Sequence, residues 1–171
     1  MEINMIARQN IIILFVLLSA VCRAQNSNIT ELLPEEIDSV HIALYDVYSK
    51  ETSTPFSYDP AKDGETEVIH YRMELKDVDR LKKKLKSKKS FNDGRALLYT
   101  YNIVFTYFEA GKEVARITIS TITGNIDGEN QLTNKVSYKH CSKSFGNYLM
   151  TLIKKYNMYS LIDESELIGI H

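Results

Sequence analysis

The chain has 171 residues, with 21 basic and 22 acidic side chains and a formal net charge of −1 at neutral pH. This balance excludes a global electrostatic attraction to nucleic acid or to an anionic membrane. The length is sufficient for one domain with its own hydrophobic core.

The first 24 residues predict a secretory signal peptide. A charged start that includes Arg8 precedes an apolar run over residues 11–18, and the triplet at 22–24 closes the segment with small Ala24. The apolar run is too short for a spanning helix, which takes about 20 residues. We therefore expect cleavage after Ala24 and no stable membrane insertion afterwards.

Two alternatives to cleavage stay open. The segment could remain as an uncleaved anchor, which its short length disfavours. It could also end in a lipoprotein anchor at Cys22, although Ser19 and Val21 stand where Leu and a small residue are usual.

Cleavage would leave Cys141 as the only cysteine and a net charge of about −2. No intramolecular disulfide is then possible, so packing alone must stabilise the domain. Exported proteins without disulfides favour a bacterial periplasm or cell surface over the eukaryotic secretory route.

Residues 25–36 are polar and predict a flexible leader into a single domain over residues 37–171. Alternating apolar residues at Val40, Ile42 and Leu44 predict a first strand. The Ser-, Pro- and Asp-rich stretch over residues 49–66 predicts a long loop.

A second alternating segment follows that loop. Its apolar side carries Ile69, Tyr71, Met73 and Leu75. Its polar side carries His70, Arg72 and Glu74 at positions i, i+2 and i+4, which places the three on one strand face.

Residues 76–89 change to a helical period. Val78, Leu81 and Leu85 form one apolar stripe, and Asp77 can cap the helix start. The remaining positions carry the largest charge feature of the chain, a run of six lysines that includes Lys83 and Lys86.

The next segments predict a long antiparallel hairpin. Residues 97–108 and 115–119 alternate on either side of a tight connection at 109–112. Gly and Asn at 124–128 indicate a turn, and residues 135–140 predict a short strand.

A second helix is expected near the end of the chain. It begins after Ser142 or Ser144 and has a wide apolar face that includes Phe145, Leu149 and Leu152. Residues 167–170 could add an edge strand.

The predicted fold is α+β: a two-layer arrangement with an antiparallel sheet of four to five strands and two amphipathic helices on one face. The other face would then be solvated. Its expected residues are His70, Arg72, Glu74, Thr100, Asn102, Thr106, Arg116, Thr118 and Ser120.

Two sets of residues are candidate binding sites. His70, Arg72, Glu74 and Arg116 could recognise a partner from the open sheet face, although any solvated strand has a similar composition. Lys83 and Lys86 could dock an acidic partner, or they could simply solvate the back of the helix.

We assign no catalytic residue, metal site or cofactor. The histidines lack the spacings that bind metals, and no nucleophile or phosphate-loop motif is present. His140 and Cys141 would point to opposite faces of a strand, which disfavours a thiolate–imidazole pair.

The sequence is therefore interpreted as an exported, non-enzymatic domain that acts by contact with another protein and not with nucleic acid. An immunity or inhibitor protein of the bacterial envelope is one concrete version. The alternatives are a small secreted enzyme that uses polar residues on the open sheet face, or a component of a surface assembly.

Overall fold

The computed structural model describes residues 28–46, 66–92, 94, 96 and 101–171. The predicted signal peptide with Cys22, nearly all of the long loop and the strand start at 97–100 lie outside these residues.

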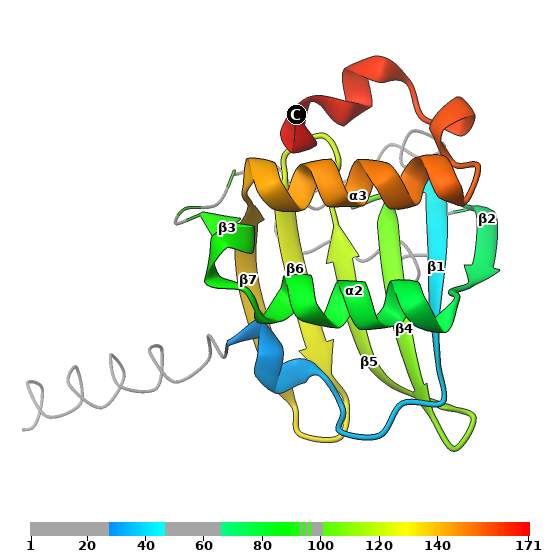
Figure 1. The fold of residues 1–171 in the computed structure, drawn as a ribbon, viewed down its shortest axis with the longest axis vertical. Coiled ribbons are helices and arrows are strands. Elements are labelled where there is room, and N and C mark those ends of the chain that lie inside the picture. The colour runs from blue at the N-terminus through cyan, green and yellow to red at the C-terminus, as the bar shows by residue number, and fades with distance from the viewer. Residues whose placement is uncertain (1–27, 47–65, 93, 95, 97–100) are drawn as a thin grey trace, which may run out of the picture.

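The described chain forms one antiparallel sheet (Figure 1) with the strand order β2-β1-β4-β5-β6-β7-β3. Each adjacent pair is antiparallel. The strands are β1 (Ser39–Asp46), β2 (Thr66–Arg72), β3 (Phe91–Asn92), β4 (Ile103–Glu109), β5 (Lys112–Ile119), β6 (Asn125–Asn130) and β7 (Lys135–Cys141). An antiparallel sheet combined with helices confirms the α+β class.

The prediction of four to five strands is wrong, because the sheet has seven. Two strands lack a readable signal. β3 has only two residues, and β6 has the sequence NIDGEN, whose Asn, Asp and Gly are typical of turns. A Cβ at Gly128 would lie 2.4 Å from Cδ1 of Leu32, so a larger residue in β6 would displace this buried side chain.

Two α-helices, α2 (Leu75–Lys86) and α3 (Lys143–Lys155), lie across the front of the sheet in Figure 1. α3 begins as predicted, because the Ser142 side chain accepts a hydrogen bond from the Phe145 backbone N–H. α2 begins differently. Glu74 stands at its N-cap without a side-chain hydrogen bond, and Asp77 is buried instead of capping the helix.

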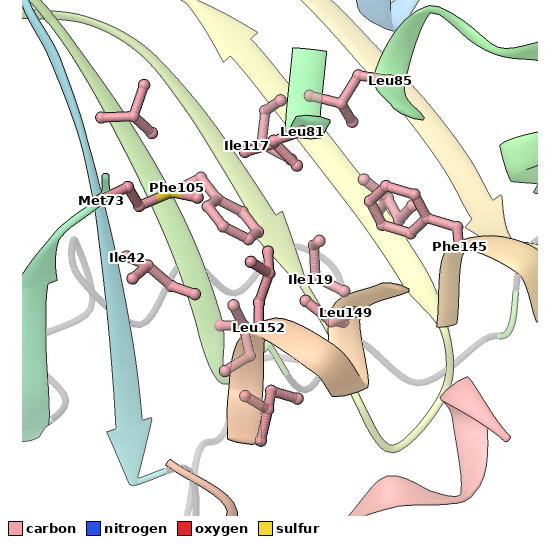
Figure 2. Packing of buried hydrophobic residues seen from close by; sticks show 14 of the residues in the cluster. Ile42, Met73, Leu81, Leu85, Phe105, Ile117, Ile119, Phe145, Leu149 and Leu152 are labelled. Carbon is pink, nitrogen blue, oxygen red and sulfur yellow. The ribbon is translucent and has the colours of Figure 1, made fainter. Parts of the chain in front are cut away.

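The hydrophobic core lies between these helices and the sheet. Figure 2 shows side chains from strands and from both helices that point into one cluster. Phe105, Ile117 and Leu149 are completely buried. Burial of a large apolar side chain contributes about 1.5–3 kcal/mol to folding, so this cluster is the main source of stability.

The packed domain begins earlier than the predicted leader suggests. Residues Ile29–Leu32 form a short 3-10 helix, η1, in which Ile29 and Leu32 are fully buried. The Asn130 side chain donates a 2.8 Å hydrogen bond to the Leu32 carbonyl. From Asn28 onward, the expected flexible leader is therefore part of the domain.

The end of the chain is also packed, but not as the predicted edge strand. The described residues also form three further 3-10 helices: η2 (Lys88–Ser90), η3 (Tyr159–Leu161) and η4 (Glu164–Ile170). Of these, η3 and η4 follow α3 and form the end of the chain. η4 lies against α3 at Gly146, where a Cβ would come within 2.1 Å of the Ile170 carbonyl oxygen. Glycine in α3 is therefore required by this close backbone approach.

The sheet face opposite the helices is not uniformly solvated. Thr118 is 6% exposed, and Asn102 and Ser120 are fully buried. Asn102 lies before β4, where its amide pairs with Thr121 through two hydrogen bonds of 2.7 and 3.0 Å. The predicted open face is thus polar but buried at these positions.

Candidate functional site

A chain of polar side chains crosses β1 and β2 on the sheet face away from the core. His41 Nδ1 lies 2.7 Å from His70 Nε2. His70 Nδ1 lies 3.3 Å from Glu67 Oε2, and His41 Nε2 lies 3.4 Å from the Ser39 hydroxyl. We call these four residues, Ser39, His41, Glu67 and His70, the histidine chain.

The strand register explains how this chain forms. His41 is opposite Arg72 and Ala43 is opposite His70 in the β1–β2 pair. Side chains at i and i+2 share one strand face, so His41 and His70 meet diagonally across the ladder. Val40 and Ile42 point to the core on the other side.

The carboxylate fixes the direction of the hydrogen bonds. An ionised Glu67 can only accept, so His70 donates to it from Nδ1. In the tautomer in which His70 Nε2 carries no proton, His41 Nδ1 donates to it and His41 Nε2 accepts from the Ser39 hydroxyl. Tyr45 strengthens the far end by donating a 3.1 Å hydrogen bond to Glu67.

The surroundings of His41 favour its neutral form. Partial burial, His70 and Arg72 together lower the pKa of His41 below its usual value of 6.5. Its ring also packs against Phe108, with 4.7 Å between the ring centroids. Burial and the adjacent side chains therefore favour the uncharged form of this imidazole.

The structure brings together only part of the predicted binding row. His70 and Arg72 lie on β2 and are both exposed. Glu74 does not share their face, because β2 ends at Arg72 and the chain turns into α2. The Glu74 carboxylate instead pairs with Lys76 at 2.8 Å and Lys155 at 2.9 Å.

Arg116 lies on the predicted face but is separated from β2 by β1 and β4. Its guanidinium forms a 2.8 Å ion pair with Glu113, and its side chain is 12% exposed. Gln131 donates a further 2.8 Å hydrogen bond to Glu113. Arg116 is therefore held by its own neighbours and does not join the site on β2.

A second polar cluster links the two helices on the opposite side of the sheet. Buried Asp77 accepts hydrogen bonds from Lys155 and from the Tyr156 hydroxyl, the latter at 2.9 Å. The Tyr156 hydroxyl in turn accepts from the Glu74 backbone N–H at 3.0 Å. We call Glu74, Asp77, Lys155 and Tyr156 the helix clamp.

The predicted lysine surface divides between several environments. Lys83 is exposed on α2, and Lys86 stands at its last residue. Lys84 donates a 3.2 Å hydrogen bond to Ser144 at the start of α3. With the helix clamp at the other end, this contact shows that α2 and α3 run antiparallel.

Cys141 ends β7 and does not begin the last helix. Burial raises the pKa of its thiol to about 12, so the group is protonated at neutral pH. His140 lies beside the Thr123 and Cys141 carbonyl oxygens, at 2.9 and 3.0 Å, and not beside the thiol. This geometry provides no thiolate–imidazole pair.

Within the described ranges, no group of three or more His, Cys, Asp or Glu side chains could hold a metal ion. No helix in the same part of the chain is long and apolar enough to cross a membrane.

Sequence reasoning missed Ser39, His41 and Glu67 as site residues. The available signal was the alternation around residues 39–45, which places Ser39 and His41 on the side away from Val40 and Ile42. The pairing of His41 with His70 depends on the strand register, which the sequence did not specify.

The fold and this site define an α+β domain whose terminal strand carries an exposed histidine and arginine. No protein-family model, curated protein or solved structure matches the chain.

Proposed function

We propose that this protein is an exported, non-enzymatic domain that binds another protein through β2 and the histidine chain. The position of β2 carries this proposal, because it is the terminal strand of the sheet and has a described strand on one side only. The ladder groups on its outer edge can pair with a strand of a partner.

The side chains along β2 are suited to such a contact. Val68 is 43% exposed, and His70 and Arg72 are exposed on the same strand. Arginine and aromatic residues are enriched in protein interfaces. With Phe108 and Tyr45 nearby on β4 and β1, the surface offers an arginine and several rings beside the last described strand of the sheet.

An immunity or inhibitor protein of the bacterial envelope is the specific role that we propose. Export is inferred from residues 1–24, and the mass of the mature protein tests it. A start at Gln25 would support cleavage, whereas diacylglycerol on Cys22 or retention of Met1 would contradict it.

Partner capture from envelope extracts tests the binding proposal. We compare the wild-type protein with Arg72→Glu on β2 and with Lys112→Glu, an exposed control in the β4–β5 hairpin. The expected result is one stoichiometric partner that the control retains and Arg72→Glu loses. Equal capture by both variants would contradict the proposed surface, and capture of the protein's own copies would favour a surface assembly.

A second candidate function is hydrolysis, because the histidine chain links a hydroxyl, two imidazoles and a carboxylate. Ser39 Oγ could attack an ester carbonyl while its proton passes to His41 Nε2, with His70 and Glu67 orienting the base. His41 would then give this proton to the departing alcohol as the ester C–O bond breaks, and water would hydrolyse the acyl-serine. Turnover of chromogenic esters that Ser39→Ala and His41→Gln both abolish would favour this function over binding. Turnover that survives both changes would exclude these residues as its source.

A further inference from the structure

We propose that a cavity beside the end of α2 binds a small anionic ligand that also has an apolar ring. The cavity has a volume of about 420 Å³, which lies within the range of small-molecule sites. It lies on the helix side of the sheet, away from the histidine chain. Its lining includes Leu85, Lys86, Lys88, Phe91, Asn92 and Lys139.

Three lysines from separate elements give the cavity its charge. Lys86 ends α2, Lys88 belongs to η2 and Lys139 belongs to β7. None of the three ammonium groups forms a hydrogen bond or ion pair with a described residue, and the cavity lining contains no carboxylate. The positive charge is therefore uncompensated and available to an anion.

The helix dipole does not explain this arrangement. Lysine at the end of a helix is favourable against the dipole, which accounts for Lys86. Lys88 and Lys139 are outside α2, so the same argument does not apply to them. Lys139 is also opposite the fully buried Ile126 in the β6–β7 pair, which directs it to the helix side of the sheet.

The remaining lining combines polar Asn28, Ser87 and Asn92 with apolar Leu85 and Phe91. Leu85 is 1% exposed, and the ring of half-buried Phe91 packs 5.9 Å from the ring of Phe145. An aromatic or aliphatic body can lie against the half-buried ring of Phe91 while its anionic group reaches the lysines. The matching chemical class is a carboxylate or phosphate attached to a ring-sized apolar group.

This inference is tested by titrating the purified protein with phenyl phosphate and with benzoate at low salt. Heteronuclear NMR spectra recorded during each titration measure the binding. The two ligands distinguish phosphate from carboxylate as the preferred anion, and binding of either supports the proposal. We expect the largest shifts at the amides of Lys88 and Phe91. Phenol, which has the ring without the charge, should bind at least about tenfold more weakly.

A triple variant, Lys86→Gln, Lys88→Gln and Lys139→Gln, should weaken binding about tenfold or more while its urea unfolding stays close to that of the wild type. Lys83→Gln is the matched control, because Lys83 lies on the same helix but outside the cavity lining. The inference fails if neither anion binds at about 10 mM, a concentration at which even a site of millimolar Kd is mostly occupied. Equal weakening by the control, or equal binding of phenol, would also overturn it.

Discussion

The helix clamp and the histidine chain are both polar networks, but they differ in burial and in how completely their groups are paired. In the helix clamp, the Asp77 side chain is 3% exposed and accepts from two donors. In the histidine chain, the side chains of His70 and Glu67 are 41% and 42% exposed, and the distance between His70 Nδ1 and Glu67 Oε2 is 3.3 Å. The first network joins two helices, whereas the second lies at the edge of the described sheet.

This difference separates a structural role from a functional one. A buried carboxylate must be fully paired, because an unpaired charge in the core is strongly destabilising. Exposed groups do not carry this constraint and can exchange their partners for those of a ligand. The helix clamp is therefore expected to determine stability, and the histidine chain is expected to respond to pH and to partners.

The largest effect is expected at Asp77. Asp77→Ala leaves the Lys155 ammonium and the buried Tyr156 hydroxyl without their shared acceptor, so the free energy of unfolding should fall by about 3 kcal/mol. Urea titration measures this change. Asp79→Ala, at an exposed position of the same helix, should cost less than about 0.5 kcal/mol. Similar losses for both variants would show that the helix clamp contributes no more than an ordinary surface residue.

A smaller, pH-dependent effect is expected at His41. Its pKa is lowered in the folded protein, so the unfolded chain binds a proton more readily. The free energy of unfolding should therefore decrease as the pH falls below about 6.5, and the decrease should level off below the folded pKa. His41→Gln should remove this part of the pH dependence in urea titrations between pH 8 and pH 5, a range of about three units around the usual histidine pKa.

The control for this measurement is His171→Gln, at an exposed position at the end of η4. It should leave the pH dependence of the wild type unchanged. If His41→Gln and the wild type keep parallel pH profiles, the histidine chain is not coupled to folding.

The parts of the fold that were predicted from sequence are those with strong hydrophobic periodicity. The apolar stripes of Leu81 and Leu85, and of Leu149 and Leu152, correctly predicted two helices that pack on the core. β6 was missed because its burial depends on neighbours from both sides and on Leu32, not on an alternating pattern of its own. Tertiary packing overrides local propensity at such a strand.

The candidate site was less predictable than the fold. His70 and Arg72 were placed together because they are separated by two positions on one strand. Their neighbours His41 and Ser39 come from a different strand, so only the register could identify them. Glu74 was misplaced for a local reason, since the strand ends two residues before it and the chain begins a helix.

The smallest effect is expected at Glu74. The sequence placed this residue in one row with His70 and Arg72, whereas the structure places it in the helix clamp. Lys76 and Lys155 lower the pKa of the Glu74 carboxyl to about 2, from a usual value of 4.5. The stability it contributes should be fully present above about pH 4.5 and should disappear as the pH falls toward 2. Glu74→Gln should therefore be slightly less stable than the wild type at pH 6, and this difference should vanish near pH 2 in urea titrations. Because Glu74 belongs to the helix clamp, the variant should capture the partner as well as the wild type does, unlike Arg72→Glu. Loss of capture by Glu74→Gln would return this residue to the binding surface and contradict the division between the two networks.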